Sequence, residues 1–251
     1  MEQIIIIGFL VLLIIITRLI PSIIYNRPSH DSFFYLLYSK KLKKKILYNK
    51  KIDILYDDPL DYSPPLYPIF LIAIPNKLIK FTPILFEIIN FGIFYFIFKT
   101  LFPEKNILLF ALLFILYPLY TSIYSGPRTY HPTPRLLTEI LFNLNFLCIF
   151  MYLQETNIFW FISACIVGSG ILLNSKFGTQ VFIFFYIPLG IFTKITEFFT
   201  IFFLTFLLAF ILSKGQLYNY IKQHIIFLIN YAKKVQFNHP VILIRNKSKI
   251  K

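Results

Sequence analysis

The sequence predicts an all-α protein, a polytopic bundle of about seven transmembrane helices whose first polar loop carries an interfacial helix. Two observations support this prediction. Hydrophobic residues make up 57% of the 251 residues and charged residues only 14%, too few to give a soluble domain a polar surface. The apolar residues also come in runs of roughly 16 to 21 positions, about the length that a helix needs to cross the hydrocarbon core.

The first predicted span covers residues 4–24. No basic segment precedes this run and no small-residue cleavage site follows it, so we expect it to be retained. A polar loop over 25–65 comes next. The apolar piece 66–74 is too short to cross alone and is bounded by prolines, which predicts a re-entrant or interfacial segment. Six further spans are predicted at roughly 81–99, 107–123, 135–153, 158–173, 178–193 and 196–213, with a second polar loop over 125–134.

These spans group into one transmembrane domain over 1–213, followed by a basic tail over 214–251. A weakly apolar patch at 225–228 of the tail is flanked by lysines, a pattern typical of an interfacial helix or a partial span. We interpret the tail as interfacial, or as the place where a longer protein is truncated.

The formal net charge of +14 would suggest a nucleic-acid partner in a soluble protein. Here the lysines cluster in loops beside predicted spans, so we expect the lipid bilayer and phosphate-bearing lipids as partners, and no nucleic acid. The positive-inside rule would place these loops in the cytoplasm. Cys148 and Cys165 lie within apolar runs and form neither a disulfide framework nor a metal-binding spacing. The sequence predicts a multi-pass protein of the cell membrane.

The first polar loop places an acid soon after the first span. Asp31 begins an amphipathic stretch to Lys45 whose apolar spacing predicts a helix on the membrane surface, with its lysines near headgroups. One interpretation is that Asp31 caps this helix. The other is that Asp31, beside His30 and Arg27, acts as general base toward an incoming hydroxyl or amine. The two roles are compatible.

Farther along the same loop, four carboxylates fall within nine residues: Asp53, Asp57, Asp58 and Asp61. Such a group would bind a divalent cation. Asp-Asp-Pro is also common in solvated turns. Asp57, Asp58 and Asp61 are therefore secondary catalytic candidates, and the sequence leaves the metal open.

The second polar loop and the span after it carry side chains suited to phosphate. Arginine presents a planar fork of donors that matches phosphate oxygens, so Arg128 and Arg135, with His131, would hold the phosphate of a lipid donor. Arg135 and Glu139 are four residues apart and would otherwise pair on one helical face. Lys176, placed at the end of a later span, would snorkel to the interface or contact the same phosphate.

Four segments, in this order, give the chain a resemblance to a known family. They are HDSFFYLLYSKKL after the first span, SPPLYP before the apolar piece, the helix start RLLTEILF and the span end LLNSKFG. Over roughly residues 1–200 the chain resembles the amino-terminal half of the GT-C membrane glycosyltransferases, the group of the protein mannosyltransferases and aminoarabinose lipid A transferases. Ser32 stands where a second acid often follows in that family, and its members are usually longer.

The resemblance implies an inverting transfer of a sugar from a polyprenyl-phosphate donor to an extracytoplasmic acceptor, with Asp31 as the catalytic base. It also implies that the first loop lies outside the cytoplasm, opposite to the side favoured by the lysines. His30 and Glu139 are further substrate-binding candidates. We expect the base and the phosphate-binding residues to converge on one polar cavity: Asp31, Arg128, His131, Arg135 and Lys176.

Two other functions fit the same pattern. A transporter or lipid flippase would use the intramembrane acids Glu87 and Glu139 along a substrate path, although no internal symmetry supports it. A polytopic polysaccharide polymerase or ligase would use arginines of a large outer loop in place of an early aspartate.

Overall fold

The computed structural model describes residues 2–24, 34–40, 42–43, 64–102, 111–112 and 133–237. Within these ranges the regular structure is helical and no strand occurs, which confirms the predicted all-α class. Most of the predicted span 107–123 lies outside the described residues. So do seven of the predicted site residues: His30, Asp31, Asp57, Asp58, Asp61, Arg128 and His131.

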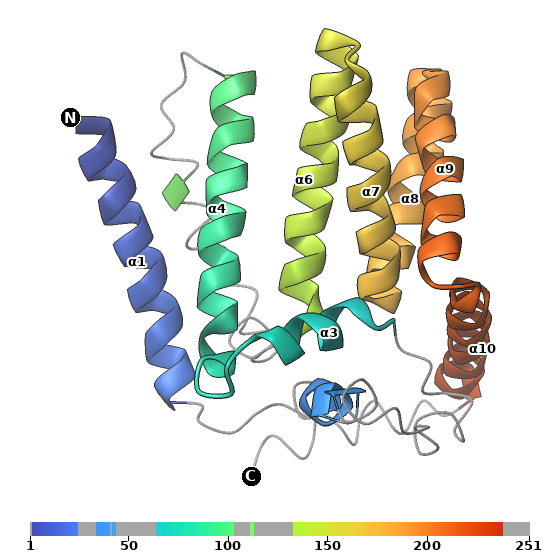
Figure 1. Cartoon of the computed structure of the whole chain (residues 1–251), viewed down its shortest axis with the longest axis horizontal. Helices are drawn as coiled ribbons and strands as arrows, with labels where there is room; N and C mark the ends of the chain where they lie inside the picture. Colours follow the sequence, from blue (N-terminus) through green and yellow to red (C-terminus); the bar gives the residue numbers. More distant parts are fainter. Residues whose placement is uncertain are drawn as a thin grey trace.

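Long helices stand side by side and shorter ones lie across one end of them (Figure 1). We call this the loop end, where α4, α6 and α8 begin and α1, α7 and α9 end. The helices are α1 (Glu2–Ile24), α3 (Leu66–Ala73), η1 (Ile79–Phe81), α4 (Thr82–Leu101), α6 (Pro134–Glu155), α7 (Ile158–Asn174), α8 (Lys176–Thr193), α9 (Thr196–Leu212) and α10 (Gln216–Phe237).

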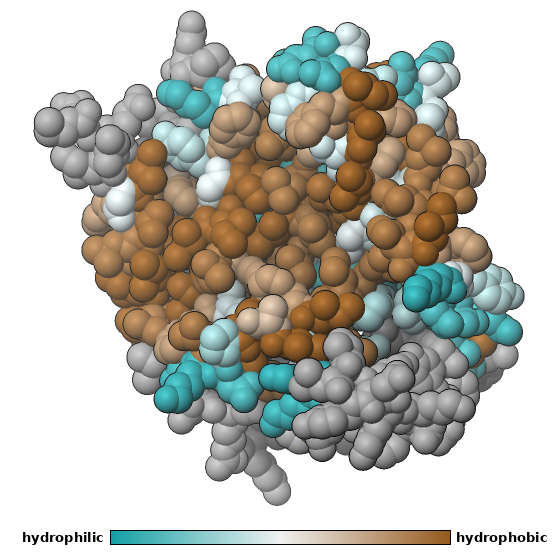
Figure 2. Space-filling model, viewed as in Figure 1, coloured by the Kyte–Doolittle hydropathy of each residue, from teal (hydrophilic) through white to brown (hydrophobic). Residues whose placement is uncertain are grey.

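Three described stretches are long and apolar enough to cross a membrane: Ile79–Leu101, Pro134–Glu155 and Lys176–Thr193. Two more, Ile7–Thr17 and Ile158–Asn174, are apolar but shorter. Figure 2 shows an apolar band across the middle of the visible face, with hydrophilic side chains toward both ends. These features indicate a membrane protein.

The boundary between α7 and α8 differs from the prediction, which put Lys176 at the end of a span. α7 ends at Asn174 and α8 begins at Lys176, because Ser175 is the N-cap and its hydroxyl accepts from the Gly178 amide at 2.8 Å. Glycine is needed at 178, since a Cβ there would lie 2.8 Å from the carbonyl oxygen of Ile171. Lys176 therefore occupies the first turn of α8.

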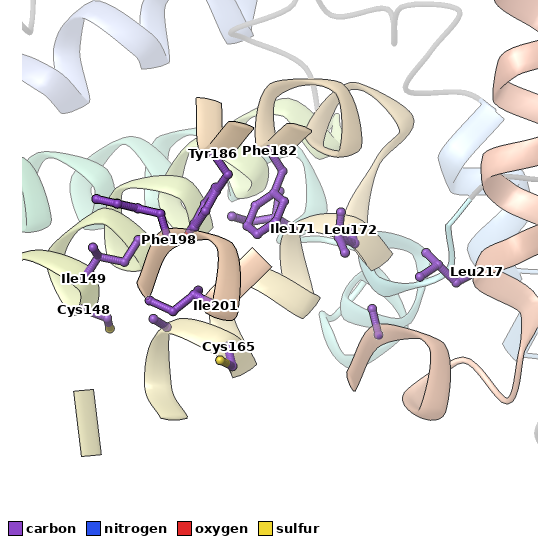
Figure 3. Close-up of a cluster of buried hydrophobic side chains, with 12 residues drawn as sticks. Cys148, Ile149, Cys165, Ile171, Leu172, Phe182, Tyr186, Phe198, Ile201 and Leu217 are labelled. Carbon is purple, nitrogen blue, oxygen red and sulfur yellow. The ribbon is translucent and has the colours of Figure 1, made fainter. Parts of the chain in front are cut away.

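The largest buried cluster joins α6, α7, α8 and α9 (Figure 3). Its centre is the stacked pair Phe182 and Tyr186, whose ring centroids are 4.2 Å apart. Asn145 of α6 links three helices, because its Nδ2 donates to the Ala164 carbonyl at 2.7 Å and its Oδ1 accepts from the Tyr186 hydroxyl. This bridge fixes the register of α6 against α7 and α8.

Residues 34–40 and 42–43 are helical and form what we call the first-loop helix. In Figure 1 it is the blue helix seen end on below the bundle, so it runs across the direction of α1. Tyr35 contacts Tyr67 of α3 edge to face at 5.5 Å, while Lys40 and Lys43 are exposed. Burial raises the pKa of the Tyr67 hydroxyl, which therefore stays protonated. The predicted helix, transverse to the bundle with outward lysines, is confirmed for these residues.

The tail begins as a helix that turns away from the bundle. Lys214 and Gly215 both adopt positive φ, at 51° and 81°, and α9 and α10 meet at 109°. The Ser213 hydroxyl accepts from the Leu217 amide at 3.0 Å, and Leu217 is buried. α10 therefore begins at the loop end and departs from the direction of α9, and the interfacial interpretation of the tail stays a prediction.

Candidate functional site

A buried polar network ties the first turn of α6 to the break between α7 and α8. The Nδ2 of Asn174 donates to the Pro134 carbonyl and to the Thr138 hydroxyl, both at 2.8 Å. Thr138 donates to the same carbonyl, and its oxygen lies 2.9 Å from that of Ser175. Because the single hydroxyl proton of Thr138 goes to Pro134, Ser175 is the donor between the two hydroxyls. The network holds three helix ends in one position.

Two oxygen atoms at this junction have no hydrogen-bond partner although they are buried. They are Oδ1 of Asn174 and Oγ1 of Thr133, the residue before α6, and the two side chains are 0% and 3% exposed. Buried polar atoms are rarely left unpaired in proteins, and a bound polar ligand or an ordered water is the usual partner. Because both atoms are enclosed, an ordered water is the partner that suits them.

Two predicted phosphate ligands belong to the helix starts beside this network. The guanidinium carbon of Arg135 lies 5.5 Å from the centre of the Phe177 ring, and Lys176 is the neighbour of Phe177 in the chain. Both cations belong to the first turns of their helices, α6 and α8, whose amino-terminal ends carry partial positive charge. Two cationic side chains and two helix amino termini therefore make the site electropositive.

Lys176 does not simply extend into solvent. It is partly buried, and it is close enough to His224 of α10 to influence the titration of that imidazole. Burial first, and the positive charge of Lys176 second, lower the pKa of His224. Lys176 is thus held between the start of α8 and α10, near Arg135.

A second polar constellation lies in the seam between α4 and α6. The Nδ2 of Asn143 donates to Oδ1 of Asn90 at 2.7 Å. The two helices run parallel (Figure 1), so one turn nearer the loop end Glu87 and Glu139 face each other, and they interact electrostatically. Glu87 is 2% exposed, whereas Glu139 keeps exposed surface.

Glu139 also interacts electrostatically with Arg135, as the predicted pairing along one face of α6 requires. This pairing is compatible with phosphate binding by Arg135, which stays a prediction. On sequence, Glu87 has a role only in the transporter alternative, whereas Asn90 and Asn143 have none. Asn90 follows Glu87 by three residues and Asn143 follows Glu139 by four, a same-face spacing that would have revealed both stripes.

The structure thus brings Arg135, Lys176 and Glu139 to one end of the bundle. The remaining site residues lie outside the described residues, and three described segments next to them in the chain reach the same end (Figure 1). Ile24 and the first-loop helix flank Asp31, and Thr133 follows the second polar loop. The predicted convergence with Asp31, Arg128 and His131 stays a prediction.

Comparison with protein-family models, curated proteins and solved structures gives no match. The chemistry of the site must be argued from its own residues. Two cations and the amino termini of α6 and α8 favour an anionic group such as a phosphate. The acid pair of the seam favours instead a proton or a cation.

Proposed function

We propose that this chain is a seven-span GT-C-like membrane glycosyltransferase, or part of one, that moves a sugar from a polyprenyl-phosphate donor to an extracytoplasmic acceptor. The observation that supports it best is the position of Arg135 and Lys176. Both belong to the first turns of helices that begin at the loop end, where the first-loop helix and the described flanks of the two polar loops also lie (Figure 1). A lipid-linked phosphate enters from the bilayer at this level, so cations held here are well placed to meet it.

In this mechanism the phosphate leaves with the lipid, and negative charge grows on it as the sugar–oxygen bond breaks. Arg135 and Lys176 stabilise that charge, together with Arg128 of the second polar loop. The aligned amino termini of α6 and α8 add to the same field.

Asp31 would take the proton of the acceptor hydroxyl as the new glycosidic bond forms. His30 and His131 would bind the sugar or the acceptor beside it. Direct displacement by the acceptor inverts the anomeric carbon, because the nucleophile attacks opposite the departing phosphate. A divalent cation at Asp57, Asp58 and Asp61 would be a further aid to binding and not a requirement of the scheme.

The proposal is tested with the purified chain in liposomes containing a radiolabelled polyprenyl-phosphate sugar. Loss of label from the lipid into water or an added acceptor measures cleavage of the donor. Asp31→Asn should abolish it, since an amide can still cap a helix but cannot accept a proton. Asp53→Asn, in the same polar loop, is the matched control and should retain most activity.

Two outcomes would reject this assignment. Full activity in the Asp31→Asn protein would reduce Asp31 to a cap and direct the search to Asp57, Asp58 and Asp61. No donor cleavage by the wild-type chain with any of a panel of polyprenyl-phosphate sugars would remove the enzyme hypothesis for this chain.

The facing acids of the α4–α6 seam favour a second candidate, a proton-coupled transporter or lipid flippase. Two carboxyl groups in mutual electrostatic contact inside a membrane protein hold a proton more readily than one alone. In liposomes with an imposed pH gradient, a transporter would show proton flux that Glu87→Gln abolishes. Flux that is the same in wild type, Glu87→Gln and empty liposomes would exclude this candidate.

A further inference from the structure

We propose that the loop end is an anionic-lipid-binding surface, formed by six exposed lysines that contact the headgroups of acidic phospholipids. We call these residues the lysine collar: Lys40, Lys43, Lys77, Lys80, Lys214 and Lys222. The inference is independent of the proposed function, because it concerns lipids around the bundle and not a reacting donor.

The first support is the distribution of charge between the two ends. All six collar residues are exposed, and the described acids nearest them, Glu87 and Glu139, lie in the α4–α6 seam and not on the end itself. At the opposite end the charges that the structure describes are mixed, with Glu155 and Glu197 beside Lys99 and Lys194. Among the residues that the structure describes, the loop end therefore has the single-sign charge that attracts an anionic leaflet.

The second support is that collar lysines alternate with exposed apolar side chains. Beside Lys77 and Lys80, Leu78 is 53% exposed and Phe81 is 37% exposed. The Nζ of Lys80 lies 4.8 Å from the Phe81 ring centre. This alternation is typical of the membrane interface, where apolar groups enter the acyl region and lysine amines reach the headgroups. A site for nucleic acid or for an acidic protein would not require exposed aliphatic residues between its cations.

α10 repeats the pattern on a larger scale. Tyr218, Lys222, Ile225 and Ile229 follow one another at helical spacing, and all four are exposed. The 109° bend at Lys214 and Gly215 directs α10 across the end of the bundle and not through the bilayer beside α9. Buried Leu217 anchors the start of the helix. An amphipathic helix in this orientation presents its lysine at headgroup level.

The tail over 214–251, which includes α10, carries charge of a single sign in its sequence. Residues 214–251 contain no Asp or Glu, while their basic residues number eight: Lys214, Lys222, Lys233, Lys234, Arg245, Lys247, Lys249 and Lys251. A lysine near an anionic membrane surface is worth about 1 kcal/mol, which is about a fivefold change in affinity. Three lysines removed together should therefore weaken binding by roughly 100-fold at low ionic strength.

The test uses the purified full chain in detergent, titrated with phosphatidylglycerol or with phosphatidylcholine, and bound lipid is counted by native mass spectrometry. Wild type should bind phosphatidylglycerol at least about tenfold more tightly than phosphatidylcholine, with weaker binding as salt is raised. K77Q/K80Q/K222Q should lose that preference. The control K99Q/K194Q, which removes two lysines from the opposite end, should keep it.

K77R/K80R/K222R retains the charge and should bind as wild type does, which separates charge from side-chain packing. Circular dichroism shows whether each variant is folded. Equal affinity of wild type for the two lipids overturns the inference, and so does an equal loss in K99Q/K194Q. Because the readout is lipid binding, a negative result here leaves the donor-cleavage assay as a separate test of the transferase proposal.

Discussion

The close approach of α7 and α9 gives the sharpest prediction about the bundle, at Gly168. A Cβ added at Gly168 would lie 2.9 Å from Cγ2 and 3.0 Å from Oγ1 of Thr205, and 3.1 Å from a ring carbon of Phe182. Thr205 and Phe182 are both 0% exposed, so neither can swing into solvent. Two residues along the same helix, a Cβ at Gly170 would meet Leu141 at 3.6 Å, which is an ordinary contact.

The two glycines therefore predict opposite signs for the same substitution. Replacing a helical glycine by alanine gains about 1 kcal/mol in helix propensity. At Gly170 that gain should remain, so Gly170→Ala is neutral or stabilising. At Gly168 the overlap should cost about 1–3 kcal/mol, the usual cost of overpacking, and outweigh the gain. We expect Gly168→Ala to be less stable than Gly170→Ala by about 1–3 kcal/mol.

The measurement is unfolding of purified protein in mixed micelles of increasing SDS fraction, followed by the fluorescence of the single tryptophan, Trp160. The double variant Gly168→Ala/Thr205→Ala removes the two nearest atoms and should recover much of the loss, with a coupling energy of about 0.5–3 kcal/mol. Equal stability of the two glycine variants, or a double variant with simply additive effects, would refute the packing of α7 against α9.

Three further predictions concern the core, the tail and the topology. Asn145→Leu should destabilise the bundle by about 2–4 kcal/mol in the same unfolding assay, because it breaks two hydrogen bonds of about 0.6 kcal/mol each and strands the buried Tyr186 hydroxyl. Adding Tyr186→Phe should restore part of this loss, and strictly additive losses would argue against the bridge. The lowered pKa of His224 means that the unfolded chain binds more protons, so stability should be full above the ordinary value of 6.5 and fall as the pH drops below it. His224→Gln should flatten this dependence, and an unchanged slope would contradict the burial of the imidazole. A cysteine at Ser63 should react with an impermeant reagent in intact cells. Background labelling should be low, because Cys148 and Cys165 are buried. Labelling only after lysis would place the lysine collar in the cytoplasmic leaflet and count against the transferase.

The helices could be predicted from sequence because each is a long apolar run between polar residues. The expected spans at roughly 81–99 and 135–153 became α4 and α6 with shifts of about one or two residues at their ends. Two amphipathic segments, the first-loop helix and α10, followed from the spacing of their lysines and apolar residues.

The sequence could not predict which side chains interact between neighbouring helices. The electrostatic interaction of Glu87 with Glu139 could not be predicted, because residue spacing within one helix says nothing about the register of its neighbour. The predicted position of Lys176, at the end of a span, was wrong for a related reason. The run LLNSKFG reads as one helix end, whereas the cap at Ser175 makes it the end of α7 and the start of α8. Convergence with Asp31 depends on residues outside the described ranges and stays a prediction.

The central claim is that Arg135 and Lys176 hold the phosphate of a lipid donor at the loop end. Binding of polyprenyl phosphate to the purified full chain, measured by native mass spectrometry, tests it most directly. Arg135→Gln should weaken binding by about 10- to 100-fold, the range expected for losing a hydrogen-bonded charge of about 1.5–3 kcal/mol, and Lys176→Gln should weaken it less. Lys99→Gln, at the opposite end, should bind as wild type does. Unchanged affinity in the Arg135→Gln protein would contradict the assignment of this site.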